Sequence, residues 1–284
     1  MDLPFLVLTF LGNEGFYLLL LPLVYWCVDK RTGVRLTFLF LLSAYVNSMA
    51  KEIVDQPRPF EFHSRVKSLV TAEGGGLPSG HTQHAVVVWG HLAMRSGRLL
   101  AWGLAILLMI GIPLSRLYLG VHFPTDLLGG YILGILLLLL YERLERRVEG
   151  VVATRNLAWR LTIAFILPAL LILLLPSGAK SGLSAGATLT GVGVGMVLEQ
   201  RWVKFSSGGP WGKRVLRLLI GLTVSVGLWV GLKVVFDTLE PEPLFRFTRY
   251  GLLGLWTALG APWIFCRLGL VEAGHEGSDQ LGSL

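Results

Sequence analysis

Apolar runs separated by short polar stretches dominate the pattern of this chain. Nine of them can be read as membrane segments, and they cover approximately residues 3–27, 34–54, 80–94, 99–114, 127–141, 161–175, 185–198, 215–236 and 250–265. A helix needs about 20 mainly apolar residues to cross the hydrocarbon core of a bilayer. The pattern therefore predicts an all-α, polytopic membrane helix bundle with about nine transmembrane helices.

Two of the nine runs carry polar residues that are costly in lipid. The first run is interrupted at Gly12–Gly15 and includes Glu14, and the third contains Gln83, His84 and His91. Polar side chains within a membrane segment face the bundle interior or the interface. We therefore expect both runs to direct these residues toward other helices or the membrane surface.

Composition also favours a membrane environment. The chain is 53% hydrophobic and only 15% charged, whereas soluble domains carry about 25% charged residues. The net charge of +7 comes from Lys and Arg residues that cluster between the apolar runs. That arrangement is typical of a topology signal, and no motif indicates nucleic acid as a partner.

Cys27 and Cys266 are too few and too isolated to form a disulfide framework or a metal site.

The basic residues predict how the chain is oriented. When successive connections are assigned to alternate sides, one side holds sixteen of the 25 Lys and Arg residues: Lys30, Arg31, Arg35, Arg95, Arg98, Arg143, Arg146, Arg147, Arg155, Arg160, Arg201, Lys204, Lys213, Arg214, Arg217 and Arg267. The richer side is expected to be cytoplasmic. This predicts an integral membrane protein, in the inner membrane if the source is bacterial, with its N-terminus outside and its C-terminus inside. The first run lacks signal-peptide features, so we expect a retained helix.

The densest group of reactive side chains lies in Ser115–Asp126, directly before the fifth run. Pro124 suits the start of a helix, because its missing N–H would have no partner there. Asp126 would then stand in or beside the first turn, within reach of His122. A carboxylate in that place fixes the imidazole tautomer and leaves the other ring nitrogen free as a nucleophile or base. The alternative is an interfacial Arg116, a core histidine and a helix-capping aspartate.

Two further polar clusters fall on the same predicted side of the membrane. Lys51 would lie in the last turn of the second helix, and Pro57 and Pro59 would present Arg58 on a stiff exit. Leu77–His81 opens the third helix with a turn whose free N–H groups and helix dipole suit an anion. Snorkelling cations and a plain helix cap are the alternatives. Together, the three clusters supply the parts for phosphoryl transfer by covalent catalysis.

In this order and spacing, the clusters resemble a known three-part signature. Six residues separate Lys51 from Arg58, the tetrad Pro78–His81 follows, and Ser115–Asp126 completes the set. The arrangement is similar to the signature of the type 2 phosphatidic acid phosphatase superfamily. The resemblance covers about residues 51–126. It implies a six-helix phosphatase core, which the run over residues 161–175 would complete.

The resemblance also implies a role for each signature residue. His122 would attack phosphorus and form a phosphohistidine, Asp126 would orient His122, and His81 would protonate the leaving oxygen. The phosphate oxygens would be held by Lys51, Arg58, Ser79, the Gly80 N–H and Arg116. The family's phosphatases need no metal, so we expect neither a metal nor another cofactor. A metal site that combines His81 with His84 and His91 is less favoured than packing roles for the latter two.

Architecture and substrate are predicted only in outline. We expect a phosphatase core over residues 1–176 with its motifs at the outer (periplasmic or lumenal) face, additional transmembrane helices over 177–270 and a polar tail over 271–284. The expected partners are membrane lipids and a substrate that is a lipid phosphate or a prenyl pyrophosphate. A glucose-6-phosphatase-like enzyme acting on a soluble or sphingoid phosphate is one alternative. A transporter that binds lipid or phosphate without cleaving it is the other.

Two smaller features have open interpretations. The loop before Pro78 carries His63, Arg65, Lys67 and Glu73, which either meet the substrate headgroup or are simply solvated. Two glycine pairs are spaced four apart in the later runs, and they are Gly191 with Gly195 and Gly227 with Gly231. Such spacing allows close helix packing in a membrane, although it also arises incidentally.

Overall fold

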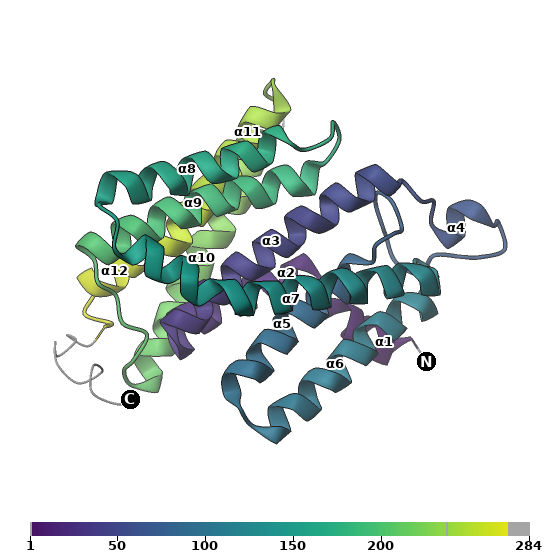
Figure 1. Cartoon of the computed structure of the whole chain (residues 1–284), viewed down its shortest axis with the longest axis horizontal. Coiled ribbons are helices and arrows are strands. Elements are labelled where there is room, and N and C mark those ends of the chain that lie inside the picture. Colours follow the sequence, from purple (N-terminus) through teal and green to yellow (C-terminus); the bar gives the residue numbers. More distant parts are fainter. Residues whose placement is uncertain (1, 237, 272–284) are drawn as a thin grey trace.

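A computed structural model describes residues 2–236 and 238–271, and every regular element in this part is a helix (Figure 1). In chain order the elements are α1 (Leu3–Phe10), α2 (Glu14–Leu23), η1 (Val24–Val28), α3 (Lys30–Val54), α4 (Pro59–Phe62), α5 (Gly80–Ser96), α6 (Leu99–Tyr118), α7 (Pro124–Ala153), α8 (Leu157–Leu173), α9 (Lys180–Trp202), α10 (Trp211–Phe236), α11 (Glu242–Leu255), η2 (Trp256–Gly260) and α12 (Ala261–Arg267). The prediction of an all-helical chain is confirmed.

Several helices are long and apolar enough to cross a membrane. Among the described residues there are 5 by length and composition, and they span Lys30–Phe62, Leu99–Tyr118, Pro124–Ala153, Lys180–Trp202 and Trp211–Phe236. A sixth is added if the bent pair α1 and α2 counts as one span. The chain is therefore an integral membrane protein with several apolar helices, while the count of nine stays a prediction.

The first apolar run forms two helices, which separate beside the polar interruption at Gly12–Gly15. Helix α1 ends at Phe10, and the segment Glu14–Val28 leaves at an angle of 54° to it. Between them Asn13 has an extended backbone, with φ −78° and ψ 151°. Residues 11–13 therefore lie outside both helices and connect α1 to α2.

Four antiparallel helices bring the signature segments to one end of the molecule. Helix α5 packs against α3, α6 and α7. The C-terminal ends of α3 and α6 lie with the N-terminal ends of α5 and α7, toward the right in Figure 1. Ser79 caps α5, since its hydroxyl accepts a hydrogen bond from the Thr82 N–H at 3.4 Å. Local capping and helix direction thus place all three parts of the signature on the same side.

The later helices pack on this group through α9. Helix α9 contacts α3, α8 and α11, and two thirds of its apolar window is buried. At Gly191 an added Cβ would lie 2.0 Å from the Gly251 carbonyl oxygen, so α9 and α11 touch through their backbones. At Gly227 and Gly231 an added Cβ would meet nothing within 4 Å. The same spacing therefore marks a tight interface on α9 but not on α10.

Candidate active site

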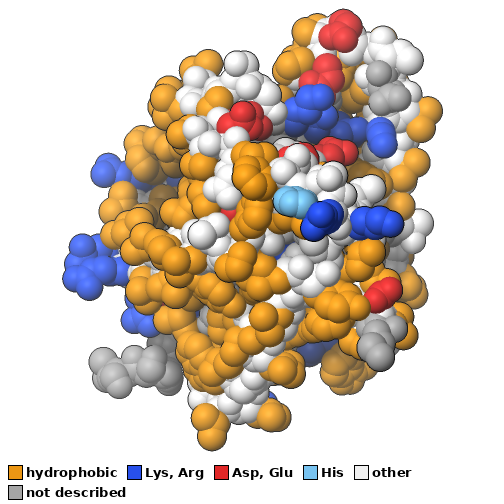
Figure 2. Space-filling view, turned by 90° about the vertical axis from the view of Figure 1, so that its right-hand side faces the viewer, with side chains coloured by type: hydrophobic (Ala, Val, Ile, Leu, Met, Phe, Trp, Pro, Cys, Tyr) orange, Lys and Arg blue, Asp and Glu red, His pale blue; other side chains and the backbone are white. Residues whose placement is uncertain are grey.

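The signature residues gather where the four antiparallel helices end. Figure 2 looks onto this end of the molecule, where charged and polar side chains form a group bordered by hydrophobic ones. The signature residues Arg58, Ser79, Arg116, His122 and Asp126 are all buried. Burial of this many polar groups requires that each be held by specific partners.

Asp126 holds His122 in one orientation. Asp126 is fully buried in the first turn of α7, and its Oδ2 lies 3.1 Å from Nδ1 of His122. The same carboxylate accepts a hydrogen bond from the Phe123 N–H at 2.9 Å and another from the Gln56 amide at 3.2 Å. Because the carboxylate accepts, Nδ1 of His122 carries the proton and Nε2 has a free lone pair.

Arg58 faces that free nitrogen. Its Nη1 lies 3.4 Å from Nε2 of His122 and donates to the Val121 carbonyl at 3.0 Å. Nε and Nη2 of Arg58 donate to the carbonyls of Gly74 and Glu73, each at 2.8 Å. These main-chain acceptors fix the guanidinium without neutralising its charge. An anion bound beside Arg58 and His122 would meet both a cation and a nucleophilic nitrogen.

Burial and positive charge keep the His122 ring neutral. Burial is the main cause that lowers the pKa of His122, and the charges of Lys51, Arg58 and Arg116 lower it further. The hydrogen bond to Asp126 acts in the opposite direction, and the net pKa is about 4. The ring is therefore unprotonated near pH 7, as a nucleophile must be.

The start of α5 connects the second and third parts of the signature. The Ser79 N–H donates to the Asp126 main-chain carbonyl at 2.9 Å. Within the described residues, the N–H groups of Gly80 and His81 donate to no protein acceptor. A helix start with free N–H groups favours a bound anion.

A buried chain of amides braces this helix start against α3. The Asn47 amide donates to the Pro78 carbonyl at 3.3 Å and to the Gln83 side chain at 2.9 Å. Gln83 in turn donates to the Ser43 hydroxyl, which lies 3.0 Å from Nδ1 of His84. His84 therefore belongs to a packing network, as the sequence favoured.

The last turn of α1 and the break that follows it supply partners that the sequence pattern did not identify. Nη1 of Arg116 donates to the Thr9 hydroxyl at 2.5 Å. Nε2 of His81 lies 2.7 Å from the side-chain oxygen of Asn13. The signal was present in the sequence, because a polar interruption inside an apolar run needs a polar neighbour. It did not, however, specify which neighbour.

Other polar residues lie outside this group. The side chains of His63, Arg65, Lys67 and Glu73 are exposed, although the Glu73 carbonyl holds Arg58. His91 lies on α5 ten residues after His81, away from the signature residues. Its Nδ1 is 2.5 Å from Oε1 of Glu142. Across the described ranges, no three His, Cys, Asp or Glu side chains are grouped to hold a metal ion.

Two sequence models of one family match the chain. The model of the PAP2 superfamily matches residues 32–148. A second model, described as PAP2 superfamily phosphatase, transmembrane extension, matches residues 183–274. The chain belongs to the PAP2 superfamily. In this PAP2 protein the first match contains all three parts of the signature, and the second covers the helices from α9 to α12.

Individual relatives of this PAP2 protein act on lipids according to their names. Sphingosine-1-phosphate phosphatase 2 of Mus musculus is 32% identical over 137 residues, which is 46% of this chain and 38% of the relative. Sphingosine-1-phosphate phosphatase 1 of Mus musculus is 23% identical over 92% of this chain and 71% of its own length. Phosphatidylglycerophosphatase B of Bacillus subtilis is 27% identical over 50% of this chain and 74% of its own length. The chain thus spans well under two thirds of the first of these relatives.

Proposed function

We propose that this PAP2 protein is an integral membrane phosphatase that removes phosphate from a lipid phosphate or prenyl pyrophosphate through a phosphohistidine at His122. One observation carries the proposal. The buried His122 ring stands between Asp126 and Arg58, with Nδ1 toward the carboxylate and Nε2 toward the guanidinium. A neutral imidazole held this way directs its lone pair to the place where Arg58 would hold a phosphate.

The reaction then proceeds in two displacements. Nε2 of His122 forms a bond to phosphorus while the bond from phosphorus to the leaving oxygen breaks, and His81 gives that oxygen its proton. Water next attacks the phosphohistidine and passes a proton to His81, which releases phosphate and restores both rings. Lys51, Arg58 and Arg116 offset the negative charge in each transition state. Ser79 and the Gly80 N–H contribute further donors.

The same proposal includes an arrangement in the membrane. We place nine spans across the bilayer, with the core over residues 1–176, further spans over 177–270 and a tail over 271–284, a segment that falls almost entirely outside the described residues. The bias of basic residues supports an active site on the outer face, an outer N-terminus and a cytoplasmic C-terminus. Hydrophobic walls then admit a lipid tail while the cations receive its phosphate.

The names of the relatives support a lipid phosphate as substrate. Two are sphingosine-1-phosphate phosphatases and one is a phosphatidylglycerophosphatase. All three names describe a phosphate monoester on an apolar molecule. We therefore rank lipid phosphate monoesters first, ahead of prenyl pyrophosphates and soluble sugar phosphates.

Phosphate release from purified protein tests the proposal. The wild type, His122→Ala and the control Arg147→Ala, at an exposed cation of α7, are assayed in detergent with sphingosine-1-phosphate, phosphatidate, phosphatidylglycerol phosphate, a prenyl pyrophosphate and glucose-6-phosphate. We expect His122→Ala to lose at least about 10⁴-fold in kcat, since removing a nucleophile abolishes its pathway. Equal release by His122→Ala would reject the role of His122. Binding of lipid without any release would indicate a transporter.

A further inference from the structure

The break between α1 and α2 is built against His81. An added Cβ on Gly12 would lie 2.7 Å from Cδ2 of the His81 ring, so the main chain itself approaches the imidazole. The next residue, Asn13, has an extended backbone and places its side-chain oxygen 2.7 Å from Nε2 of His81. Four residues earlier, Thr9 bonds Arg116. Three contacts from one short segment therefore meet the site.

We propose that Asn13 is a positioning residue for His81, an inference that rests on the proposed function. The amide oxygen of Asn13 accepts the Nε2–H of His81 and so fixes the ring and its tautomer. Within the described residues, no hydrogen bond engages Nδ1 of His81. Nδ1 is thus the nitrogen that gives its proton to the leaving oxygen and later takes one from water, while Nε2 keeps its own.

The charges around His81 explain why a neutral acceptor matters. The groups that face it are Lys51 from α3, His84 from α5, Arg116 from α6 and His122 from the connection before α7. All four are cations or become cations on protonation, so they oppose a protonated His81. An amide oxygen aimed at Nε2 stabilises the protonated ring without adding a negative charge that would repel phosphate.

The proposal is tested by removing the Asn13 amide oxygen and comparing substrates whose leaving groups differ in their need for a proton. Asn13→Leu keeps the approximate size of the side chain and removes the oxygen. We expect kcat for a lipid phosphate to fall about 10²-fold, the lower range of a general-acid contribution, with KM little changed. The pre-steady-state burst of p-nitrophenolate from p-nitrophenyl phosphate should be nearly unaffected, because it reports the first displacement alone and this leaving group departs without a proton. Equal losses in the two measurements would indicate mere structural damage and overturn the proposal, as would no loss in either.

A second variant tests the same contact through pH. Asn13→Asp retains an acceptor and adds a negative charge beside the ring, which favours the protonated form. Compared with Asn13→Leu, we expect Asn13→Asp to keep most of the wild-type kcat for the lipid phosphate, with KM raised by the added negative charge, and to move the alkaline limb of the kcat profile about one pH unit upward. An unmoved limb would contradict the proposal. The control is Phe10→Leu, at an exposed position of α1, which should match the wild type in both measurements.

These outcomes separate the two proposals. If wild type and His122→Ala release phosphate equally, the proposed function fails and the role of Asn13 fails with it. If release depends on His122 but Asn13→Leu behaves as the wild type on both substrates, only the role of Asn13 fails.

Discussion

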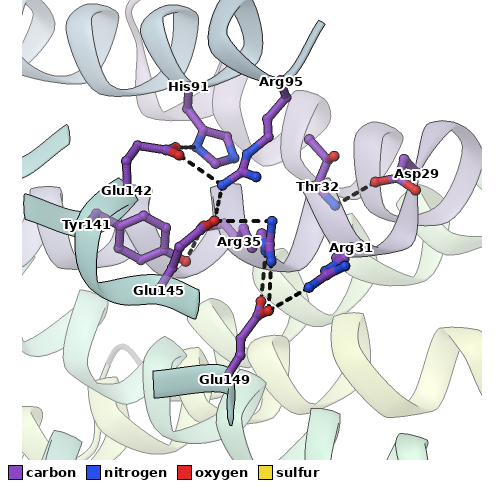
Figure 3. A network of polar contacts seen from close by, with 10 residues as sticks. All are labelled: Asp29, Arg31, Thr32, Arg35, His91, Arg95, Tyr141, Glu142, Glu145 and Glu149. Carbon is purple, nitrogen blue, oxygen red and sulfur yellow. Dashed lines mark hydrogen bonds and ion pairs between the residues drawn. The ribbon is translucent and has the colours of Figure 1, made fainter. Parts of the chain in front are cut away.

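Helices α3, α5 and α7 carry a charged cluster near each end, and the two clusters are built in opposite ways. At the end that carries the signature residues, the guanidinium groups of Arg58 and Arg116 donate to main-chain carbonyls and to a threonine hydroxyl. Within the described residues, neither they nor Lys51 pairs with a carboxylate within 4.0 Å. A second group of charges, which we call the inner cluster, lies at the other end of these helices, and there Arg31, Arg35 and Arg95 each pair with a glutamate (Figure 3).

The inner cluster balances its charges internally. Arg35 pairs with Glu149 at 2.6 Å and with Glu145 at 3.1 Å, and Arg95 joins Glu145 to Glu142. The members seen in Figure 3 are Arg31, Arg35, Arg95, Glu142, Glu145 and Glu149, with His91 and Tyr141 beside them. Three cations therefore face three carboxylates. Such a cluster ties α3, α5 and α7 together and leaves no net charge for a ligand.

Distance keeps the two clusters independent. On α3, Lys51 and Arg35 are sixteen residues apart, which corresponds to about 24 Å along a helix. That is close to the thickness of a bilayer's hydrocarbon core, about 30 Å. The comparison shows that arginine alone does not indicate an anion site. The end with the signature residues differs because its cations are fixed by neutral partners, which leaves their charge available to a phosphate.

The largest expected effect on stability comes from Arg35→Ala. This change leaves Glu145 and Glu149 without their shared cation, and losing one partner of a buried ion pair costs about 3–5 kcal/mol. Thermal unfolding in detergent should detect the loss, and Arg147→Ala is the control. The kcat of the protein that still folds should stay near the wild-type value. A strong drop in kcat with unfolding unchanged would mean that the inner cluster belongs to the active site.

Arg58→Ala should lower activity rather than stability. We expect kcat/KM to fall about 10²- to 10³-fold, as when one donor to a transition-state oxyanion is removed. Arg58→Lys should recover part of the activity, since it keeps the charge but loses the two-pronged geometry. Steady-state kinetics on protein shown to be folded provides the measurement. Full activity in Arg58→Ala would show that the Arg58 charge does not bind the phosphate, and so would contradict the proposed difference between the two ends of the helices.

The pH dependence sharpens the comparison further, because the unbalanced cations also act on His122. Its pKa of about 4, below the ordinary 6.5, means that the ring is neutral at any pH well above 4. The acid limb of kcat/KM should therefore lie near pH 4 once the substrate's own phosphate ionisation, titrated separately, is divided out. A limb near pH 6.5 would show a solvated ring free of those cations.

Much of the fold could be predicted because apolar runs report helices directly. Some helices are longer than the predicted apolar runs, because they continue into polar sequence. Helix α7, for example, continues to Ala153 and includes the glutamates of the inner cluster. Hydropathy does not register those residues as helical, since their stability depends on arginines from α3 and α5. The glycine pairs show the same limit. Gly191 meets another backbone and Gly227 meets nothing, although their spacing is identical.

The parts of the site that depend on residues close together in the sequence could be predicted. The contact of His122 with Asp126 follows from the start of α7 at Pro124, and the structure has both. The contacts made by Thr9 and Asn13 join residues about 70 to 110 positions apart, and no local pattern encodes such pairs.

Trapping the covalent intermediate is the most direct test of the central claim, that the unbalanced cations hold a phosphate against His122. Protein is mixed with a lipid phosphate labelled with ³²P, quenched within milliseconds in alkali, and digested for mass spectrometry. The account predicts a base-stable, acid-labile phosphate on His122 that is absent from His122→Ala and reduced in Arg58→Ala. Turnover without label on His122, or label on another residue, would contradict it.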